Sequence, residues 1–185
     1  MNKKKSFLSV REMVEIALLL AIAVVLDLAG IKIYHASFTM VPLFILAYRH
    51  GFIRSFIVIG VIYSLVNVMF DSWGTNPIFL VFDYFMGFGC IALAGLFNKR
   101  IFNVNNSLFL RMSLLVGSIV LCSVIRILCS SISGMIVYTL SFSESFVANL
   151  TIYVGWDCLL ALVGLIVLYP SLLFLNKRFP MNLLK

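Results

Sequence analysis

Four charged side chains interrupt otherwise apolar stretches of the sequence, and they are the residues best placed to do chemistry. They are Asp27, Asp83, Arg126 and Asp157. A charge inside a lipid bilayer is unfavourable by several kcal/mol unless it is paired or faces water, so such residues are functional candidates by default. At 1.5 Å per helical residue, all four lie in the outer half of the expected helices or near their middle, about 5 to 18 Å from the outer ends. This placement predicts a polar pocket that opens outward.

Polar and aromatic residues accompany these charges at helical spacing. Arg126 and Ser130 share a stripe that Tyr138 extends, Tyr84 follows Asp83, and Trp156 precedes Asp157. Carboxylates beside Tyr and Trp rings suit a flat, cationic, heteroaromatic ligand, because negative charge and the face of a ring both attract cations. We therefore expect a substrate site made by seven residues, namely Asp83, Tyr84, Arg126, Ser130, Tyr138, Trp156 and Asp157.

A structural interpretation of the same charges stays open. Arg126 can pair with Asp83 or Asp157 and join helices without touching a ligand, and Asp27 can cap a helix end. The protein would then be a structural or assembly component of a membrane. A ligand with a carboxylate would instead need Arg126, the basic residue deep enough to meet it.

The composition requires these side chains to be held by membrane helices. Of the 185 residues, 63% are hydrophobic and only 11% are charged, whereas a soluble domain is about a quarter charged. Apolar runs of the length that spans a bilayer predict an all-α integral membrane protein, with six helices in one domain covering 1–185. The expected helices are 12–30, 37–48, 52–70, 77–97, 108–138 and 146–174. The second is short and contains Pro42, so we expect it to be tilted, extended by its flanks or irregular.

The basic residues predict the orientation of this bundle. Alternate connecting segments, starting with the N-terminus, hold twelve of the fourteen Lys and Arg residues, whereas the other connections hold Lys32 alone. The positive-inside rule then places both termini in the cytoplasm. Because the net charge of +7 is spread between apolar runs, it indicates topology and not binding of nucleic acid. His35 and His50 fall in breaks on opposite sides and are expected at the surface.

Several kinds of catalytic motif are absent from the sequence. It lacks G-x-x-x-x-G-K-[ST], H-E-x-x-H and G-x-S-x-G, the motifs of phosphate-binding loops, zinc proteases and serine hydrolases. The four cysteines lie in apolar runs without metal-ligand spacing, and we interpret them as small buried side chains. We therefore expect a binding protein without a cofactor, not an enzyme, and any ATP hydrolysis belongs to a partner. Ala17 and Ala21, at i and i+4, permit close approach of another helix.

Motifs spread along nearly the whole chain resemble one family of membrane proteins. They are Glu15-Ile16-Ala17 through Ala23, Met40-Val41-Pro42-Leu43 leading to Tyr48-Arg49-His50-Gly51, Phe82-Asp83-Tyr84, Ala92 through Phe97, and Asn176-Lys177-Arg178-Phe179-Pro180. In this order and at these separations they are similar to the S components of energy-coupling factor vitamin transporters, and most similar to the thiamine-specific group.

The resemblance implies a six-helix subunit of the bacterial plasma membrane that captures thiamine. It also implies association with a transmembrane coupling protein, contacted through Ala17 and Ala21, and with two cytoplasmic ATPases. Asp83 and Tyr84 match the acidic residue and Tyr of the thiamine site, Arg126 its basic residue, and Tyr138 a position where the family tends to have Trp.

The chain departs from the family at other site positions. Ser130 replaces a His. Trp156 and Asp157, or Tyr153 and Val154 in a shifted register, replace Tyr and Asn. These departures keep riboflavin, pyridoxine and pantothenate as alternative substrates.

Overall fold

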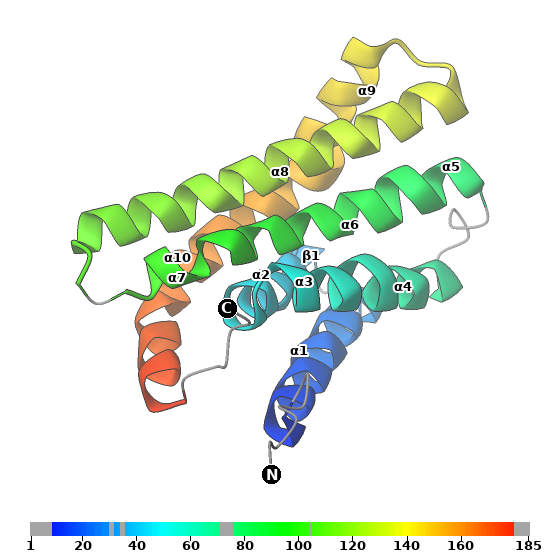
Figure 1. The fold of residues 1–185 in the computed structure, drawn as a ribbon. Helices are drawn as coiled ribbons and strands as arrows, with labels where there is room; N and C mark the ends of the chain where they lie inside the picture. Colours follow the sequence, from blue (N-terminus) through cyan, green and yellow to red (C-terminus); the bar gives the residue numbers. More distant parts are fainter. Residues whose placement is uncertain (1–8, 30–31, 34–35, 71–75, 104, 180–185) are drawn as a thin grey trace.

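The computed structural model describes residues 9–29, 32–33, 36–70, 76–103 and 105–179, and most of them are helical (Figure 1). Long helical stretches Phe52–Phe70, Pro77–Ile101 and Phe142–Arg178 join α8 (Leu108–Tyr138) as four helices long and apolar enough to cross a membrane. The predicted ranges 52–70 and 108–138 are confirmed to the residue, and 77–97 and 146–174 are extended at one or both ends. The chain is therefore a helical membrane protein, as predicted.

Two further helices precede these four. α1 (Val10–Leu28) has 19 residues but carries four charges, and α2 (Met40–His50) has 11 residues, so α2 rises about 16 Å, roughly half of a bilayer core. Pro42 lies in the first turn of α2, where the missing N–H is tolerated, and the helix is regular. A short antiparallel ladder, β1 (Lys32–Ile33) and β2 (Ala36–Ser37), connects α1 to α2 where the sequence predicted only a break and the start of a helix.

Three of the long stretches depart from α-helical geometry in their middle. Phe52–Phe70 consists of α3 (Phe52–Ser55), the π-helix η1 (Phe56–Tyr63) and α4 (Ser64–Phe70). Pro77–Ile101 consists of α5 (Pro77–Phe79), the π-helix η3 (Leu80–Met86), α6 (Gly87–Gly89), the 3₁₀ segment η4 (Cys90–Phe97) and α7 (Asn98–Ile101). Phe142–Arg178 consists of α9 (Phe142–Ala148), the π-helix η5 (Asn149–Tyr153) and α10 (Val154–Arg178). π-Helical segments occur frequently at functional sites, and η3 holds Asp83 and Tyr84.

The short helix α2 is the centre of the packing. Every residue of α2 except Ile45 is buried, and α2 packs against α1, η4 and α10. Gly51, with φ of 76°, ends the helix in a conformation that other residues rarely adopt. Gly95 of η4 lies against this end, where a Cβ atom would come within 2.7 Å of the Ala47 carbonyl oxygen. The core therefore depends on a backbone contact between α2 and η4.

Gly95→Ala is expected to destabilise the protein by about 2 kcal/mol, because the added methyl group overpacks a contact made by backbone atoms that cannot rotate away. Thermal unfolding in detergent measures the effect. Gly117→Ala is the matched control, since a Cβ at Gly117 meets nothing within 4 Å. Equal melting temperatures for the two variants would contradict the assigned close packing.

Ion pairs fix α1 to the end of α2 and to α3. Arg49 pairs with Glu15 through two nitrogens, and Arg54 Nη1 lies 2.9 Å from Glu12 Oε1. His50, at 3% exposure, is buried beside them, so the prediction of a surface position for His50 is wrong. The reason is that Gly51 turns the chain back on itself, which encloses the end of α2 between α1 and α3. His35 lies outside the described residues.

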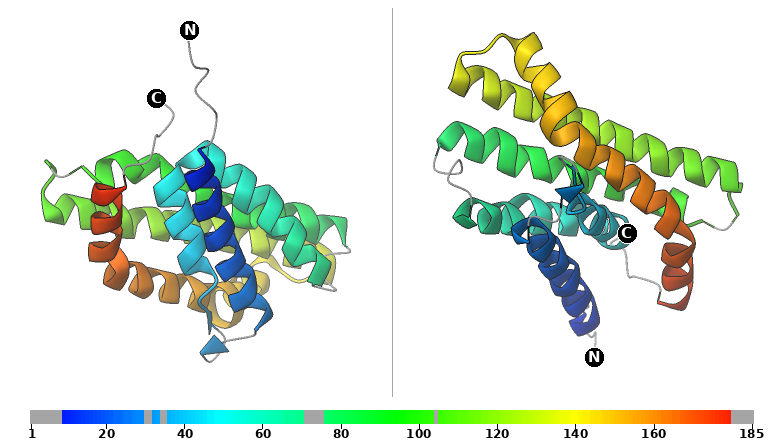
Figure 2. Two further views of the ribbon diagram at one scale, coloured as in Figure 1. Left: turned by 90° about the horizontal axis from the view of Figure 1, so that it is seen from below. Right: turned by 180° about the vertical axis from the view of Figure 1, so that it is seen from behind.

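The remaining helices cover this core. α8 packs on η4 and η3, and α10 packs on both α2 and α8. Figure 2 shows α10 bending before its C-terminal turns. α10 contains Pro170, which removes a helical hydrogen bond. Cys90, Cys122, Cys129 and Cys158 are all buried and free, as predicted.

Candidate functional site

Asp83 lies in η3 and is half-buried against α8. Ser130 Oγ donates a hydrogen bond of 2.5 Å to Asp83 Oδ1. Ser130 is itself buried, at 7% exposure. The structure thus brings together two of the predicted residues from helices that are distant in sequence, and it orients the carboxylate toward α8.

Arg126 lies one helical turn before Ser130 on α8, and its side chain is 7% exposed. Its Cζ lies 3.8 Å from the centroid of the Phe88 ring, a cation–π contact. Arg126 Nε and Nη1 are buried without a hydrogen-bond partner. The ion pairs among the described residues do not include Arg126, so the proposed structural pairing with Asp83 or Asp157 is not found there.

The Phe88 ring beneath the guanidinium packs against a second aromatic ring. Tyr84 is buried, and its ring centroid lies 6.3 Å from that of Phe88. Ser64 Oγ of α4 donates to the Tyr84 carbonyl at 2.9 Å, which fixes η3 against α4. Phe88 was not among the predicted site residues, although its position four residues after Tyr84 is the spacing at which helical neighbours meet. Together, Asp83, Arg126 and these rings offer one acceptor, two free donors and flat apolar faces.

Three other predicted residues have more open positions. The ring of Tyr138 packs edge-on against Phe79 and is 46% exposed. Trp156 is 39% exposed, and its Nε1 donates to the Thr151 carbonyl oxygen at 2.7 Å. Asp157 is half-buried on α10. Near Tyr138, Ser145 Oγ donates to the Ser131 carbonyl at 2.9 Å, which brings α9 onto α8.

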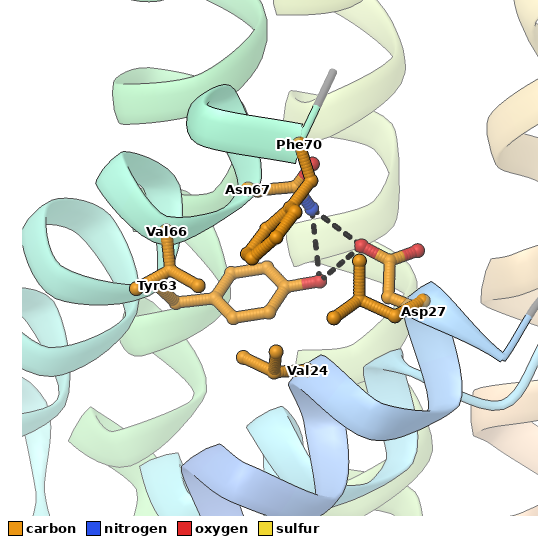
Figure 3. Close-up of a pocket in the computed structure, with 7 residues that line it drawn as sticks. Val24, Asp27, Tyr63, Val66, Asn67 and Phe70 are labelled. Atoms are coloured by element: carbon orange, nitrogen blue, oxygen red, sulfur yellow. Dashed lines mark hydrogen bonds between the residues drawn. The ribbon is translucent and has the colours of Figure 1, made fainter.

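A second polar group, which the sequence did not reveal, joins the end of α1 to η1 and α4 (Figure 3). Tyr63 Oη donates to Asp27 Oδ2 at 3.0 Å, and Asn67 Nδ2 donates to the same oxygen at 2.6 Å. These residues line a cavity of about 170 Å³ together with Val24, Leu28, Val66 and Phe70. The spacing of Tyr63 and Asn67 at i and i+4 was the available signal, but nothing in the sequence assigned them to Asp27.

The described residues contain no group of three or more His, Cys, Asp or Glu side chains arranged to hold a metal ion. Two contacts join this region to α8: the hydrogen bond from Ser130 to Asp83 of η3, and the cation–π contact between Arg126 and Phe88 of α6 (Gly87–Gly89).

Residues 13–177 match the family model described as thiamine transporter protein (Thia_YuaJ). The chain belongs to this family of thiamine transporters. The membership confirms the resemblance to the thiamine-specific group, and it favours thiamine over riboflavin, pyridoxine or pantothenate and over a purely structural role.

A solved structure of ThiT from Listeria monocytogenes has the same fold as this thiamine transporter family member. The two share 22% sequence identity with a TM-score of 0.65, over 91% of this chain and 94% of that chain. No curated protein matches the chain. The fold is therefore supported over nearly the full length of both chains.

Proposed function

We propose that this chain is the substrate-capturing subunit of an ATP-driven thiamine uptake system, and that thiamine binds between η3 and α8. Asp83 accepts hydrogen bonds from the aminopyrimidine of the ligand, and Tyr84 stacks on its ring. Arg126 and Ser130 complete the inner wall, and Tyr138, Trp156 and Asp157 close the site from α8 and α10. This chain supplies no catalytic residue.

One observation carries this proposal: a buried guanidinium with two unpartnered donors lies one helical turn before Ser130, which holds the Asp83 carboxylate. Burying such donors without partners is unfavourable by about 1–3 kcal/mol each, and a polar ligand relieves that penalty. A structural pair would have satisfied Arg126 with Asp83 directly. In a thiamine transporter, the ligand that fits such a site is thiamine.

The proposed topology has six crossings in one domain, with both termini in the cytoplasm of a bacterium and the site facing outward. Two features support it. The start of α1 and the end of α10 lie on the same side of the bundle (Figure 2, left). The carboxylates of Glu12 and Glu15, which form ion pairs with Arg54 and Arg49, lie at the opposite end of α1 from Asp27. The ion-paired charges of α1 are therefore separated from the cavity at Asp27.

The proposed partners are a transmembrane coupling protein and two cytoplasmic ATPases. Ala17 and Ala21 are exposed on α1, on a face that also exposes Val14, Leu18 and Ile22 to 54%, 59% and 49%. Small side chains within an apolar stripe allow a partner helix to approach closely. This face supports a contact with the coupling protein, while lipid surrounds the rest of the bundle.

Titration of the purified protein with thiamine is expected to change its intrinsic fluorescence in a saturable manner, because Trp156 lies at the edge of the proposed site. Trp73, the other tryptophan, lies outside the described residues. Riboflavin, pyridoxine and pantothenate serve as comparison ligands. Saturation by one of those three vitamins, but not by thiamine, would contradict the proposed substrate. If the fluorescence responds to none of the four and the protein retains no radiolabelled thiamine, the capture function would be contradicted.

A further inference from the structure

The cavity at Asp27 combines one carboxylate with aromatic walls, and its polar groups are arranged unequally. Tyr63 and Asn67 both donate to Oδ2 of Asp27, whereas Oδ1 accepts no hydrogen bond from the described residues. Asp27 is absent from the ion pairs of the described residues. A half-buried carboxylate at the cavity wall therefore keeps one oxygen free of hydrogen bonds from the described residues.

The cavity walls favour a particular class of ligand. Tyr63 and Phe70 line it with their rings, next to the carboxylate (Figure 3). A carboxylate beside ring faces attracts an organic cation through both charge and cation–π interaction. A metal ion is less suited, because Tyr63 Oη and Asn67 Nδ2 direct their hydrogens, not their lone pairs, toward Asp27. At about 170 Å³, the cavity has room for several waters or for one compact cationic group.

The cavity is adjacent to the proposed thiamine site. The Tyr63 ring contacts Phe88 edge-on, with centroids 4.8 Å apart, and Arg126 lies over the same Phe88 ring. Ser64, the next residue after Tyr63, donates to the carbonyl of Tyr84. The two places therefore share a wall of aromatic side chains, and each holds one carboxylate, Asp83 in one and Asp27 in the other.

We infer that the Asp27 cavity is a separate outer binding site for a compact organic cation, and that it first receives the thiazolium group of thiamine. This inference rests on the proposed function and deepens it. The inner site at Asp83 selects the pyrimidine half through hydrogen bonds and ring contacts. In the outer cavity, the Asp27 carboxylate attracts the permanent positive charge of the thiazolium group.

The test measures association of radiolabelled thiamine with the purified full chain at low and high ionic strength. Asp27→Asn keeps an oxygen that accepts from Tyr63 and Asn67 but removes the charge. We expect association to be about 10-fold slower at low salt and much less affected at high salt, because steering by a charge is screened. Equilibrium competition by the uncharged aminopyrimidine half of thiamine is expected to be unchanged.

Glu144→Gln is the matched control, because Glu144 is an exposed carboxylate whose capping role glutamine also fills. If Asp27→Asn does not fold, Phe70→Leu removes the exposed ring and leaves the carboxylate, and it is expected to slow association severalfold. Unchanged association, or equal slowing for thiamine at both salt concentrations, would overturn the inference and leave Asp27 as a tether between α1 and α4. The proposed function fails separately, if thiamine affinity does not depend on Asp83.

Discussion

Asp83→Asn is expected to weaken equilibrium binding of thiamine by about 100-fold, close to 3 kcal/mol. The carboxylate is the acceptor of the proposed site, and Ser130 holds it in place through Oδ1. An amide of the same shape removes the charge and replaces one acceptor with a donor, so the hydrogen bonds to an aminopyrimidine are lost or reversed. Isothermal titration of the purified variant with thiamine measures the change.

Glu144→Gln serves again as the control, because it removes a carboxylate at the surface of α9 without touching η3 or α8. Melting temperature is recorded for both variants, since Asp83 also anchors Ser130. Wild-type affinity in a folded Asp83→Asn variant would remove Asp83 from the site. A loss of affinity in Glu144→Gln as large as in Asp83→Asn would show that net charge, and not the site, governs binding.

Much of the fold was predictable because hydropathy reports burial in lipid directly. The range 108–138 was predicted to the residue, since Ser107 caps its start and the apolar run continues to Tyr138. The short ladder before α2 was not predictable, because each strand has two residues and shows no alternation. The burial of His50 was also missed: its position depends on how α1, α2 and α3 meet, and no local pattern of the sequence encodes that contact.

Some residues of the candidate site could be selected from the sequence because their polarity departs from the apolar runs around them. Charge inside an apolar run is rare enough to identify Asp83 and Arg126, and i, i+4 spacing added Ser130. Which residues lie together between helices is a tertiary property, so the contact of Arg126 with Phe88 and the group around Asp27 were not found. A role in binding stays a prediction for all seven residues, and two of them, Tyr138 and Trp156, contact Phe79 and Thr151 in the structure.

Replacing both Ala17 and Ala21 with leucine is expected to abolish thiamine uptake by cells and to leave thiamine binding by the purified chain unchanged. Both alanines are exposed on α1, which holds none of the residues of the proposed site. Leucine side chains hold a partner helix away, so the close packing on which coupling depends is lost. The expected result is a separation of two functions: uptake falls to the level of cells without the protein, while binding affinity stays within twofold.

Gly117→Leu is the control for added bulk on an exposed helix face, because a Cβ at Gly117 meets nothing within 4 Å and lies on α8, away from α1. Uptake of radiolabelled thiamine, binding by the purified protein and copurification of the coupling protein are compared for both variants. Normal uptake in the double α1 variant would exclude this face as the coupling contact. If thiamine binding is lost together with uptake, α1 supports the thiamine site instead. The change would then reach the core around α2 through the ion pairs of α1 with Arg49 and Arg54.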